Sequence, residues 1–432
     1  MADVPNESAP APRRIAMLSL HTSPLAPLGG RETGGMNVYV REVAAQLAAL
    51  GIAVDVFTRR TSTTEDEVRA IAHGARLVQI TAGPKSRIEK EEMLPFTEAF
   101  ADGVEAFRAC EGVTYDVIYS HYWLAAEAGA ILARCWGVPH AAMFHTLAEV
   151  KLRARASESE PRERIEAERR LVGGLDRIIA ATEHERRLLT QIYRVPAGRV
   201  AVVPLGVDLD QFQPRSQSEA RAALGIDPDE RMVLAVGRIE PLKGFDILIR
   251  AIAQLSDRRG VVLSIIGGDE RASREIDALR AVAEGVGVAD AVRFLGPRPH
   301  EALPAYYNAA DVVAVPSFYE SFGLVAVEAM ASGVPVVASR VGGLASTVAD
   351  GRTGYLIPWR CPEPFAEKIE LLLRNEELRR ALGQAAAERM RSYSWAEVAR
   401  AVSAVLGALI AEREAGEAAG GEAVAGSIRL PA

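Results

Sequence analysis

Short apolar runs alternate with longer amphipathic stretches along most of the chain. The apolar runs are rich in valine, isoleucine and alanine and end in glycine, histidine or serine, which is typical of buried strands. We therefore predict strands at residues 15–20, 54–58, 77–80, 116–120, 140–144, 177–181, 232–236, 261–266, 292–295, 312–315 and 335–338.

Helical patterns fill the intervals between these runs, because apolar residues recur there every three or four positions. The clearest of them lie at residues 38–50, 97–109, 166–175, 245–254 and 364–373. Strands that alternate with helices indicate parallel sheets covered by helices on both faces. The predicted fold class is therefore α/β, with doubly wound parallel sheets.

The alternation pauses once, at residues 202–214, with the sequence VVPLGVDLDQFQP. Its content of proline, glycine and aspartate is typical of a linker between domains. We therefore predict two Rossmann-like domains, at residues 14–205 and 208–392. In doubly wound sheets, ligands bind at the carboxyl ends of the strands, so a cleft between two such domains is expected to hold the site.

The two ends of the chain differ from its middle. The last helical stretch, at residues 395–414, either closes the second domain or crosses back to complete the first, and we favour the second alternative. Residues 1–13 are polar and rich in proline, and residues 415–432 are rich in glycine, alanine and glutamate. Both tails are expected to be disordered.

Composition narrows the class of protein. Of the 432 residues, 49% are hydrophobic and 25% charged, which is ordinary for a soluble folded protein, and the net charge of −7 argues against a general nucleic-acid binder. No run of about 18 apolar residues predicts a membrane span, and no apolar signal core follows the start. The three cysteines, Cys110, Cys135 and Cys361, lack the spacing of metal ligands or of a disulfide set. We expect a cytoplasmic protein without a metal.

Three of the seven histidines come directly after predicted strands of the first half: His21, His121 and His145. A single histidine at such a position is more often structural than catalytic. Three at equivalent ends of one sheet point to a common cleft, so we expect at least one of them to serve the site.

A glycine-rich loop follows His21 and leads into the first helix. Gly34 and Gly35 would let the backbone approach an anion there, with the helix dipole directed at it. The dinucleotide fingerprint G-x-G-x-x-G and the P-loop G-x-x-x-x-G-K-[ST] are both absent from the sequence, which disfavours common NAD enzymes and ATPases.

The second half carries a pair of cations after a predicted strand, in the segment GRIEPLKG. Arg238 and Lys243 lie five residues apart on one loop, where they could neutralise a diphosphate as a glycosyl bond breaks. Elsewhere such a pair would be two solvated surface charges. Only five residues of the chain are lysines among 50 lysines and arginines, which favours a chemical role for Lys243.

Two glutamates flank a predicted short helix at residues 322–332, for which Ser321 is the expected N-cap. Glu320 precedes the helix and Glu328 lies two turns into it, so the carboxylates would be about 12 Å apart. That separation exceeds the range of about 5–9.5 Å found in glycosidase pairs. It suits one long ligand held at both ends, with Glu320 at a sugar and Glu328 at ribose hydroxyls.

Together these residues resemble the family-4 retaining glycosyltransferases, over roughly residues 14–410. The motifs that carry the resemblance are GRIEPLKG, PSFYESFGLVAVEAMASGVPVVAS and VGGLASTVADGRTGYLIP. The resemblance implies the GT-B fold and metal-independent transfer from a nucleotide sugar, with UDP as the expected nucleotide, with no further cofactor and with retention of configuration. The implied catalytic residues are His145, Arg238, Lys243 and Glu320. The implied donor-binding residues are Gly35, Arg238, Lys243, Arg298, Glu320, Phe322, Gly323, Leu324 and Glu328.

The first half is similar to the subgroup that contains D-inositol-3-phosphate glycosyltransferases of mycothiol synthesis and, at a greater distance, sucrose-phosphate synthases. The matching segments are HTSPLAPLGGRETGGMNVYV, AGPKSRIEKEEMLP, SHYW and HTLAEVK. The resemblance implies that a phosphorylated acceptor is bound by His21, Thr33, Asn37, Lys90, Tyr122, Thr146 and Arg164. Residues 153–170 depart from that subgroup in length and composition, and Leu152 replaces its usual asparagine.

The expected reaction is front-face transfer of glucose or GlcNAc to an inositol phosphate or a similar small acceptor, in which the departing diphosphate helps to deprotonate the acceptor hydroxyl. Alternatives remain open: sucrose-phosphate synthesis, transfer to a lipid-linked acceptor, the GT-B UDP-GlcNAc 2-epimerase reaction, and a binding subunit without catalysis. The mixed-charge run at 151–170 either touches anionic lipid or phosphate or forms a solvated helix face, which we favour. Formation of a homodimer is also left open.

Overall fold

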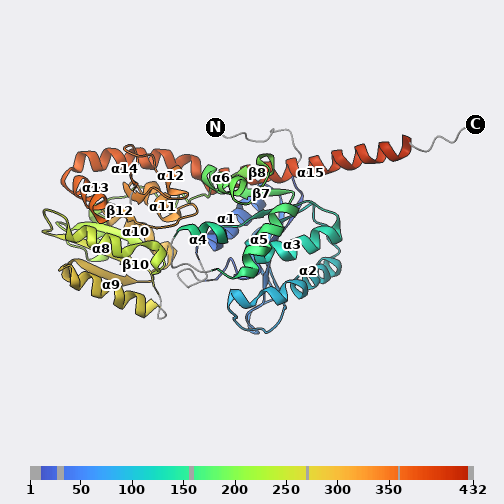
Figure 1. The fold of residues 1–432 in the computed structure, drawn as a ribbon, viewed down its shortest axis with the longest axis horizontal. Coiled ribbons are helices and arrows are strands. Elements are labelled where there is room, and N and C mark those ends of the chain that lie inside the picture. Colours follow the sequence, from blue (N-terminus) through green and yellow to red (C-terminus); the bar gives the residue numbers. More distant parts are fainter. Residues whose placement is uncertain (1–10, 27–33, 155–159, 269–271, 359–360, 427–432) are drawn as a thin grey trace, which may run out of the picture.

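The computed structural model describes residues 11–26, 34–154, 160–268, 272–358 and 361–426, with only the backbone path for 417–426. Two α/β units lie side by side, each built on one sheet (Figure 1). The strands of the first sheet are β1 (Arg14–Leu18), β2 (Ala53–Arg59), β3 (Val68–Ala72), β4 (Ala75–Ile80), β5 (Val117–His121), β6 (His140–Met143), β7 (Arg177–Ala180) and β8 (Val200–Val202). Those of the second are β9 (Arg231–Val236), β10 (Val261–Ile266), β11 (Val292–Gly296), β12 (Val312–Val315), β13 (Val336–Ser339) and β14 (Gly354–Ile357). The predicted α/β class is confirmed.

The strand orders place a switch point in each sheet. The first sheet has the order β3-β4-β2-β1-β5-β6-β7-β8, and the second has β11-β10-β9-β12-β13-β14. All named pairs are parallel except the edge pair β3–β4, which is antiparallel. The order reverses between β1 and β5 and between β9 and β12, so ligand crevices are expected at the carboxyl ends of these four strands.

Helices cover both faces of each sheet. On the first sheet they are α1 (Gly35–Ala49), α2 (Thr97–Glu111), α3 (Trp123–Trp136), α4 (Ala148–Ala154), α5 (Arg162–Gly174) and α6 (Glu183–Gln191). On the second they are α7 (Gln217–Leu224), α8 (Phe245–Ala253), α9 (Ser273–Gly285), α10 (Leu303–Ala309), α11 (Leu324–Ala331), α12 (Leu344–Thr347), α13 (Pro362–Arg374) and α14 (Glu376–Met390), and α15 (Trp395–Gly426) follows. Short 3₁₀ turns that bear on the site are η1 (Lys90–Glu92), η4 (Pro241–Lys243), η7 (His300–Ala302) and η8 (Arg391–Tyr393).

Alternate residues of each strand enter different hydrophobic cores, as the two-residue period of a strand requires. Along β1, Ile15 and Met17 face α1 and α15, whereas Ala16 and Leu18 join the core of α2 and α3. The core on the α1 side continues through the linker into the second sheet, while a separate core lies under α8, α9 and α13. The two units therefore share one continuous apolar layer.

The last helix lies against α1 of the first unit. Figure 1 shows α15 running from the second unit across the first. Next to its start, Val207 of the linker donates its N–H to the Tyr393 carbonyl at 2.8 Å, and Trp395 stands edge-on to Tyr39 of α1 with ring centroids 6.0 Å apart. A Cβ at Gly206 would lie 2.6 Å from the Trp395 ring. Glycine is therefore required where the two crossing segments touch.

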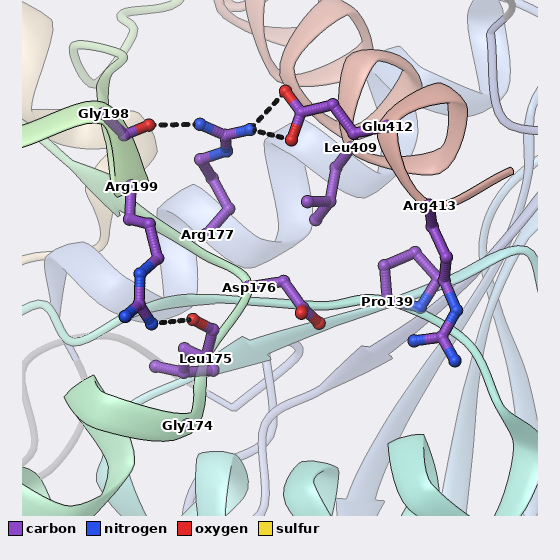
Figure 2. A pocket seen from close by; sticks show the side chains of 10 residues that line it. All are labelled: Pro139, Gly174, Leu175, Asp176, Arg177, Gly198, Arg199, Leu409, Glu412 and Arg413. Carbon is purple, nitrogen blue, oxygen red and sulfur yellow. Dashed lines mark hydrogen bonds and ion pairs between the residues drawn. The ribbon is translucent and has the colours of Figure 1, made fainter. Parts of the chain in front are cut away.

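Farther along, an ion pair ties α15 to the first sheet at the opposite end from the ligand crevice. Arg177 donates from Nη2 to both carboxylate oxygens of Glu412 at 2.7 Å, and its Nη1 donates to the Gly198 carbonyl (Figure 2). These residues line a cavity of about 560 Å³ beside Pro139 and Leu409, where β6 and β7 begin. The contact anchors the helix and lies away from the strand ends that carry the predicted site.

The structure differs from the predicted elements in several places. Strands β3, β8 and β14 were not predicted, and β8 ends at Val202, the first residue of the segment that we assigned to the linker. Helix α15 continues to Gly426, past the predicted end at residue 414, where we expected a disordered tail. Alanine and glutamate are strong helix formers, so the composition of this segment supports a helix as well as disorder.

Candidate active site

The carboxyl ends of β9 and β12 bring together the cation and the acid predicted for the second half. Lys243 Nζ donates to Glu320 Oε2 at 2.7 Å, and both side chains are 19% exposed. Arg238 lies on the same loop as Lys243, pairs with Glu240 at 3.0 Å and is 45% exposed. Three charged residues from two strand ends thus border the crevice at the switch point.

Glycines allow the loops at these strand ends to pack backbone against backbone. A Cβ at Gly342, which has φ +47°, would collide with the Glu320 carbonyl oxygen, and a Cβ at Gly244, with φ +67°, would collide with that of Pro316. The Gly343 N–H donates to the same Glu320 carbonyl at 2.9 Å. The glycines of the GRIEPLKG and VGGLAST segments therefore hold Lys243 and Glu320 in place.

The helix after Glu320 begins later than predicted, and its cap is different. Helix α11 starts at Leu324 with Gly323 as N-cap, in the left-handed region at φ +94°, and no side chain caps it. Ser321 instead donates its hydroxyl to Tyr319 Oη at 3.2 Å. The expected Ser321 cap is wrong. Gly323 adopts a left-handed conformation, which is easy for glycine, and it turns the chain into the helix, so Gly323 occupies the N-cap position in place of Ser321.

The N-terminal ends of two helices lie against each other where the two units meet. Helix α1 begins at Gly35, and a Cβ on Gly35 would lie 2.9 Å from Leu324 Cδ1 at the start of α11. Phe322 is buried beside this contact. Helix N-termini carry unsatisfied N–H groups and a positive partial charge, which favour an anionic group beside them.

Glu328 lies within α11, is buried and has two partners that the sequence did not suggest. Its carboxylate is 2.8 Å from His300 Nε2 and accepts from Tyr307 Oη at 2.9 Å. Burial lowers the pKa of His300, but the hydrogen bond and charge of Glu328 outweigh this, so the net shift is upward. Close by in sequence, Arg298 donates to Tyr306 Oη at 2.8 Å. His300 follows Arg298 in the segment GPRPHE, and this adjacency was the one available signal for it.

The three histidines at the ends of β1, β5 and β6 lie near one another. His121 Nδ1 is 3.0 Å from His145 Nε2, and His145 has φ +60°, which is rare for a residue with a side chain. Burial lowers the pKa of His145 to about 3. Burial, assisted by Lys90, His145 and Arg164, also lowers the pKa of His21 to about 3. These rings are neutral near pH 7, so they act as hydrogen-bonding groups and not as cations.

Arg164 forms the centre of a second cluster in the first unit. It is buried, donates from Nη2 to the Thr146 carbonyl and Oγ1 at 2.9 and 3.1 Å, and lies 4.9 Å from the Tyr122 ring centroid. His21 packs on Tyr122, and the centroids of the two rings are 4.5 Å apart. With Lys90, the Arg164 and Tyr122 side chains line a cavity of about 220 Å³. Five of the residues predicted for the acceptor are therefore neighbours.

Asn37 has a different environment from the one that we expected. It is buried, and its Nδ2 donates to Thr22 Oγ1 and to the Ser23 carbonyl, each at 2.8 Å, while its Oδ1 accepts from Gly34 N–H at 3.0 Å. These bonds tie the start of α1 to the loop after β1. Thr33 lies outside the described residues.

The two units meet around Tyr319. Its half-buried ring comes from the loop after β12 of the second unit, packs against apolar side chains of the first unit and lies near Arg164. Burial is the main cause of its raised pKa, with Glu185 and Glu320 adding to the shift. Tyr319 thus connects the Arg164 cluster with the Lys243–Glu320 pair. Apart from the motif that contains it, no feature of the sequence indicates a role for this position.

Comparisons with known proteins cover both units. Residues 33–211 match the family described as Glycosyltransferase Family 4, and residues 216–389 match Glycosyl transferases group 1. A D-inositol 3-phosphate glycosyltransferase of Corynebacterium glutamicum is 41% identical over 406 residues, which cover 92% of this chain and 97% of that protein. A protein of the same name from Actinosynnema mirum is 43% identical over 404 residues, 91% of this chain and 97% of that protein.

Solved structures with the same architecture include a sucrose-phosphate synthase of Thermosynechococcus elongatus, with a TM-score of 0.85 and 34% identity over 93% of this chain and 100% of that one. The Anabaena protein HepE, in complex with UDP and glucose, has a TM-score of 0.72 at 21% identity, covers 92% of this chain and 100% of its own, and shows likeness of fold alone. Along the described part of the chain, no helix is both long and apolar enough to cross a membrane.

Proposed function

The chain belongs to glycosyltransferase family 4 and has the GT-B fold, and on this premise we propose that it moves a hexosyl group from a UDP-sugar to D-inositol 3-phosphate with retention of configuration. Glycosyl transfer from a nucleotide sugar follows from family membership. The identity of the sugar, of the base and of the acceptor is our proposal, and relatives at 41% and 43% identity over nearly their whole length support the acceptor.

The observation that carries the proposal is the 2.7 Å pair of Lys243 and Glu320 at the carboxyl ends of β9 and β12. A diphosphate placed beside this pair would have Lys243 and Arg238 on one side and the N-terminus of α11 on the other. Cations and helix amides at that place oppose the charge that develops on a leaving diphosphate, and they therefore lower the barrier to glycosyl transfer.

The remaining donor contacts follow from the direction of α11. Glu328 lies farther along this helix than the position proposed for the diphosphate. Its carboxylate would accept hydrogen bonds from the ribose hydroxyls of the donor in place of its bonds to His300 and Tyr307. Glu320 would accept from hydroxyls of the transferred sugar, and neutral His145 would face the same sugar from the first unit. Arg298 would lie near the base.

No protein nucleophile is needed in this scheme. The acceptor hydroxyl attacks the anomeric carbon on the face from which the diphosphate departs, and a phosphate oxygen takes the hydroxyl proton. The bond from the anomeric carbon to the diphosphate breaks as the new glycosidic bond forms. Lys90, Tyr122, Thr146 and Arg164 would hold the acceptor phosphate, with His21 beside them.

A second candidate is synthesis of sucrose phosphate, which the 34% identity to a sucrose-phosphate synthase over 93% of the chain favours. That reaction also uses a phosphorylated acceptor, a fructose phosphate. Membership in a glycosyltransferase family favours transfer over the 2-epimerase alternative.

A donor and acceptor screen tests the proposal. Purified enzyme is incubated with UDP-glucose or UDP-GlcNAc and with D-inositol 3-phosphate, unphosphorylated inositol, fructose 6-phosphate or no acceptor, and released UDP is measured. We expect rapid release only with D-inositol 3-phosphate. Release with fructose 6-phosphate alone would establish the second candidate, and release that is independent of any acceptor would contradict both.

A further inference from the structure

The guanidinium of Arg164 has a partner on each of its three nitrogens. Nε donates to Glu168 Oε1 at 2.7 Å, Nη1 donates to Glu160 Oε2 at 2.7 Å, and Nη2 donates to the carbonyl and hydroxyl of Thr146. The side chain is only 3% exposed. Four of its five N–H donors are engaged in these bonds, so an anion that binds this arginine through two N–H groups must take the place of a group that is already bound to it.

Two of the three partners are fixed. Glu168 is completely buried and also accepts from Tyr193 Oη at 2.7 Å and from Ala148 N–H at 2.9 Å, so its removal would leave several buried donors unsatisfied. The Thr146 carbonyl belongs to the backbone between β6 and α4. Neither group can leave without disturbing the fold around it.

Glu160 is the exchangeable partner. Its carboxylate bridges two cations, with Oε1 2.6 Å from Lys151 Nζ and Oε2 2.7 Å from Arg164 Nη1. Burial raises the pKa of Glu160, but Arg164 and Lys151 outweigh it and bring the net pKa below its ordinary value, so the group is an anion near neutral pH. One anion that spans an ammonium and a guanidinium has the hydrogen-bonding pattern of a bound phosphate.

The adjoining cavity has the wrong charge for a phosphate while Glu160 stays in place. Its charged lining consists of two cations, Lys90 and Arg164, against three acids, Glu91, Glu160 and Glu163. A phosphate monoester carries nearly two negative charges near pH 7 and would be repelled. Displacement of Glu160 removes one acid from the lining and makes the donors of Arg164 and Lys151 available.

We propose that Glu160 determines the specificity of the acceptor site, because its carboxylate occupies the place of the acceptor phosphate on Arg164 and Lys151 and competes with it. This rests on the proposed function, in which the acceptor is a phosphate ester. A phosphate ester exchanges with Glu160, since it bears more charge and more acceptor oxygens than a carboxylate. An unphosphorylated polyol leaves Glu160 in place and gains nothing from the two cations.

The test compares Glu160→Gln with Glu163→Gln in the full-length enzyme. Glu163 lines the same cavity, yet among the described residues it makes no ion pair with Arg164 or Lys151. Binding of inorganic phosphate is measured by calorimetry without donor, and the KM for D-inositol 3-phosphate by UDP release. We expect Glu160→Gln to bind phosphate about tenfold more tightly and to lower the acceptor KM, since it removes a charged competitor. Glu163→Gln removes one repelling charge of the lining but leaves that competitor in place, so it should tighten phosphate binding by no more than about twofold.

Unchanged or weaker phosphate binding by Glu160→Gln would overturn the proposal and make Glu160 a positioning group for Arg164. Glu160→Ala is the second variant and should shift phosphate affinity in the same direction. If both variants fail to fold, Glu160 is structural and the proposal is also overturned. Failure of the parent enzyme to use D-inositol 3-phosphate would contradict only the proposed acceptor. The proposal for Glu160 would still be tested, since the phosphate titration needs no donor and no transfer.

Discussion

Lys243 and Glu320 come from loops that lie 77 residues apart in sequence, and their 2.7 Å contact exists because β9 and β12 are neighbours in the sheet. In such a contact the ammonium has two possible partners: the carboxylate that holds it in the free protein, and a diphosphate in the donor complex. A compact ammonium on a flexible chain suits this exchange better than a planar guanidinium would.

Replacement of Lys243 should therefore remove catalysis and leave the fold intact. We expect Lys243→Ala to lower kcat by about 10²–10³, the usual loss for one electrostatic contact to the charge of a transition state. Lys368→Ala is the control, because Lys368 pairs with Glu367 on the surface of α13 at 31% exposure. UDP release and thermal melting are measured for both. Near-normal turnover by Lys243→Ala would exclude the proposed role.

The sequence predicted the charged residues of the site better than their surroundings. Arg238, Lys243 and Glu320 follow apolar runs, and the rule for strand ends suffices to bring them together. His300 and Tyr307 could not be found in this way, because they come from a 3₁₀ turn and a helix that reach Glu328 only through the tertiary fold. Their roles, like those of the predicted site residues, stay predictions until variants are assayed.

At the level of elements, the loops depend on a few glycines that let one backbone touch another. Most strands were predicted, since a buried parallel strand is a continuous apolar run. Strand β3 was not predicted because it is an exposed antiparallel edge strand with an arginine at its second position. Strand β8 was not predicted because it has only three residues. The burial of such short edges depends on neighbours, which local sequence does not specify.

Gly342→Ala tests the glycine support of the Glu320 loop. The alanine would need a left-handed φ of +47° and would collide with the Glu320 carbonyl. Gly351 is a matched control, since its φ is +73° but a Cβ there meets no atom within 4 Å. We expect Gly351→Ala to cost about 1 kcal/mol of stability with normal kcat, and Gly342→Ala to cost about 3 kcal/mol and lower kcat at least about tenfold. Equal kinetics for the two variants would show that this contact does not position Glu320.

At the scale of the whole molecule, one apolar core and the returning helix α15 join the two units. The first unit also holds several histidines, buried or half-buried, at the ends of its strands. Burial lowers the pKa of His21, His140 and His145 to about 3, from an ordinary value of 6.5. The folded protein keeps these rings neutral at a pH at which the unfolded chain protonates them.

The stability of the protein should therefore decrease as the pH falls from 6.5 toward 3, since the unfolded state binds more protons in this window. The expected loss for each histidine between pH 7 and pH 5 is about 2 kcal/mol. His300 acts in the opposite sense, because its raised pKa gives a contribution that is present below pH 6.5 and lost as the pH rises through the raised value.

Urea unfolding at pH 7 and pH 5 measures this dependence. His140→Gln should weaken it, because His140 is buried against Ser120 at 2.8 Å, whereas His73→Gln at an exposed position should not change it. Stability that is equal at the two pH values would show that the buried histidines are not held neutral by the fold.

The most direct test of the proposed donor site is a crystal structure of the enzyme with UDP bound. We expect the diphosphate to lie within hydrogen-bonding distance of Lys243 and Arg238, at the N-terminus of α11, with the ribose hydroxyls on Glu328. A nucleotide bound away from the carboxyl ends of β9 and β12 would contradict it.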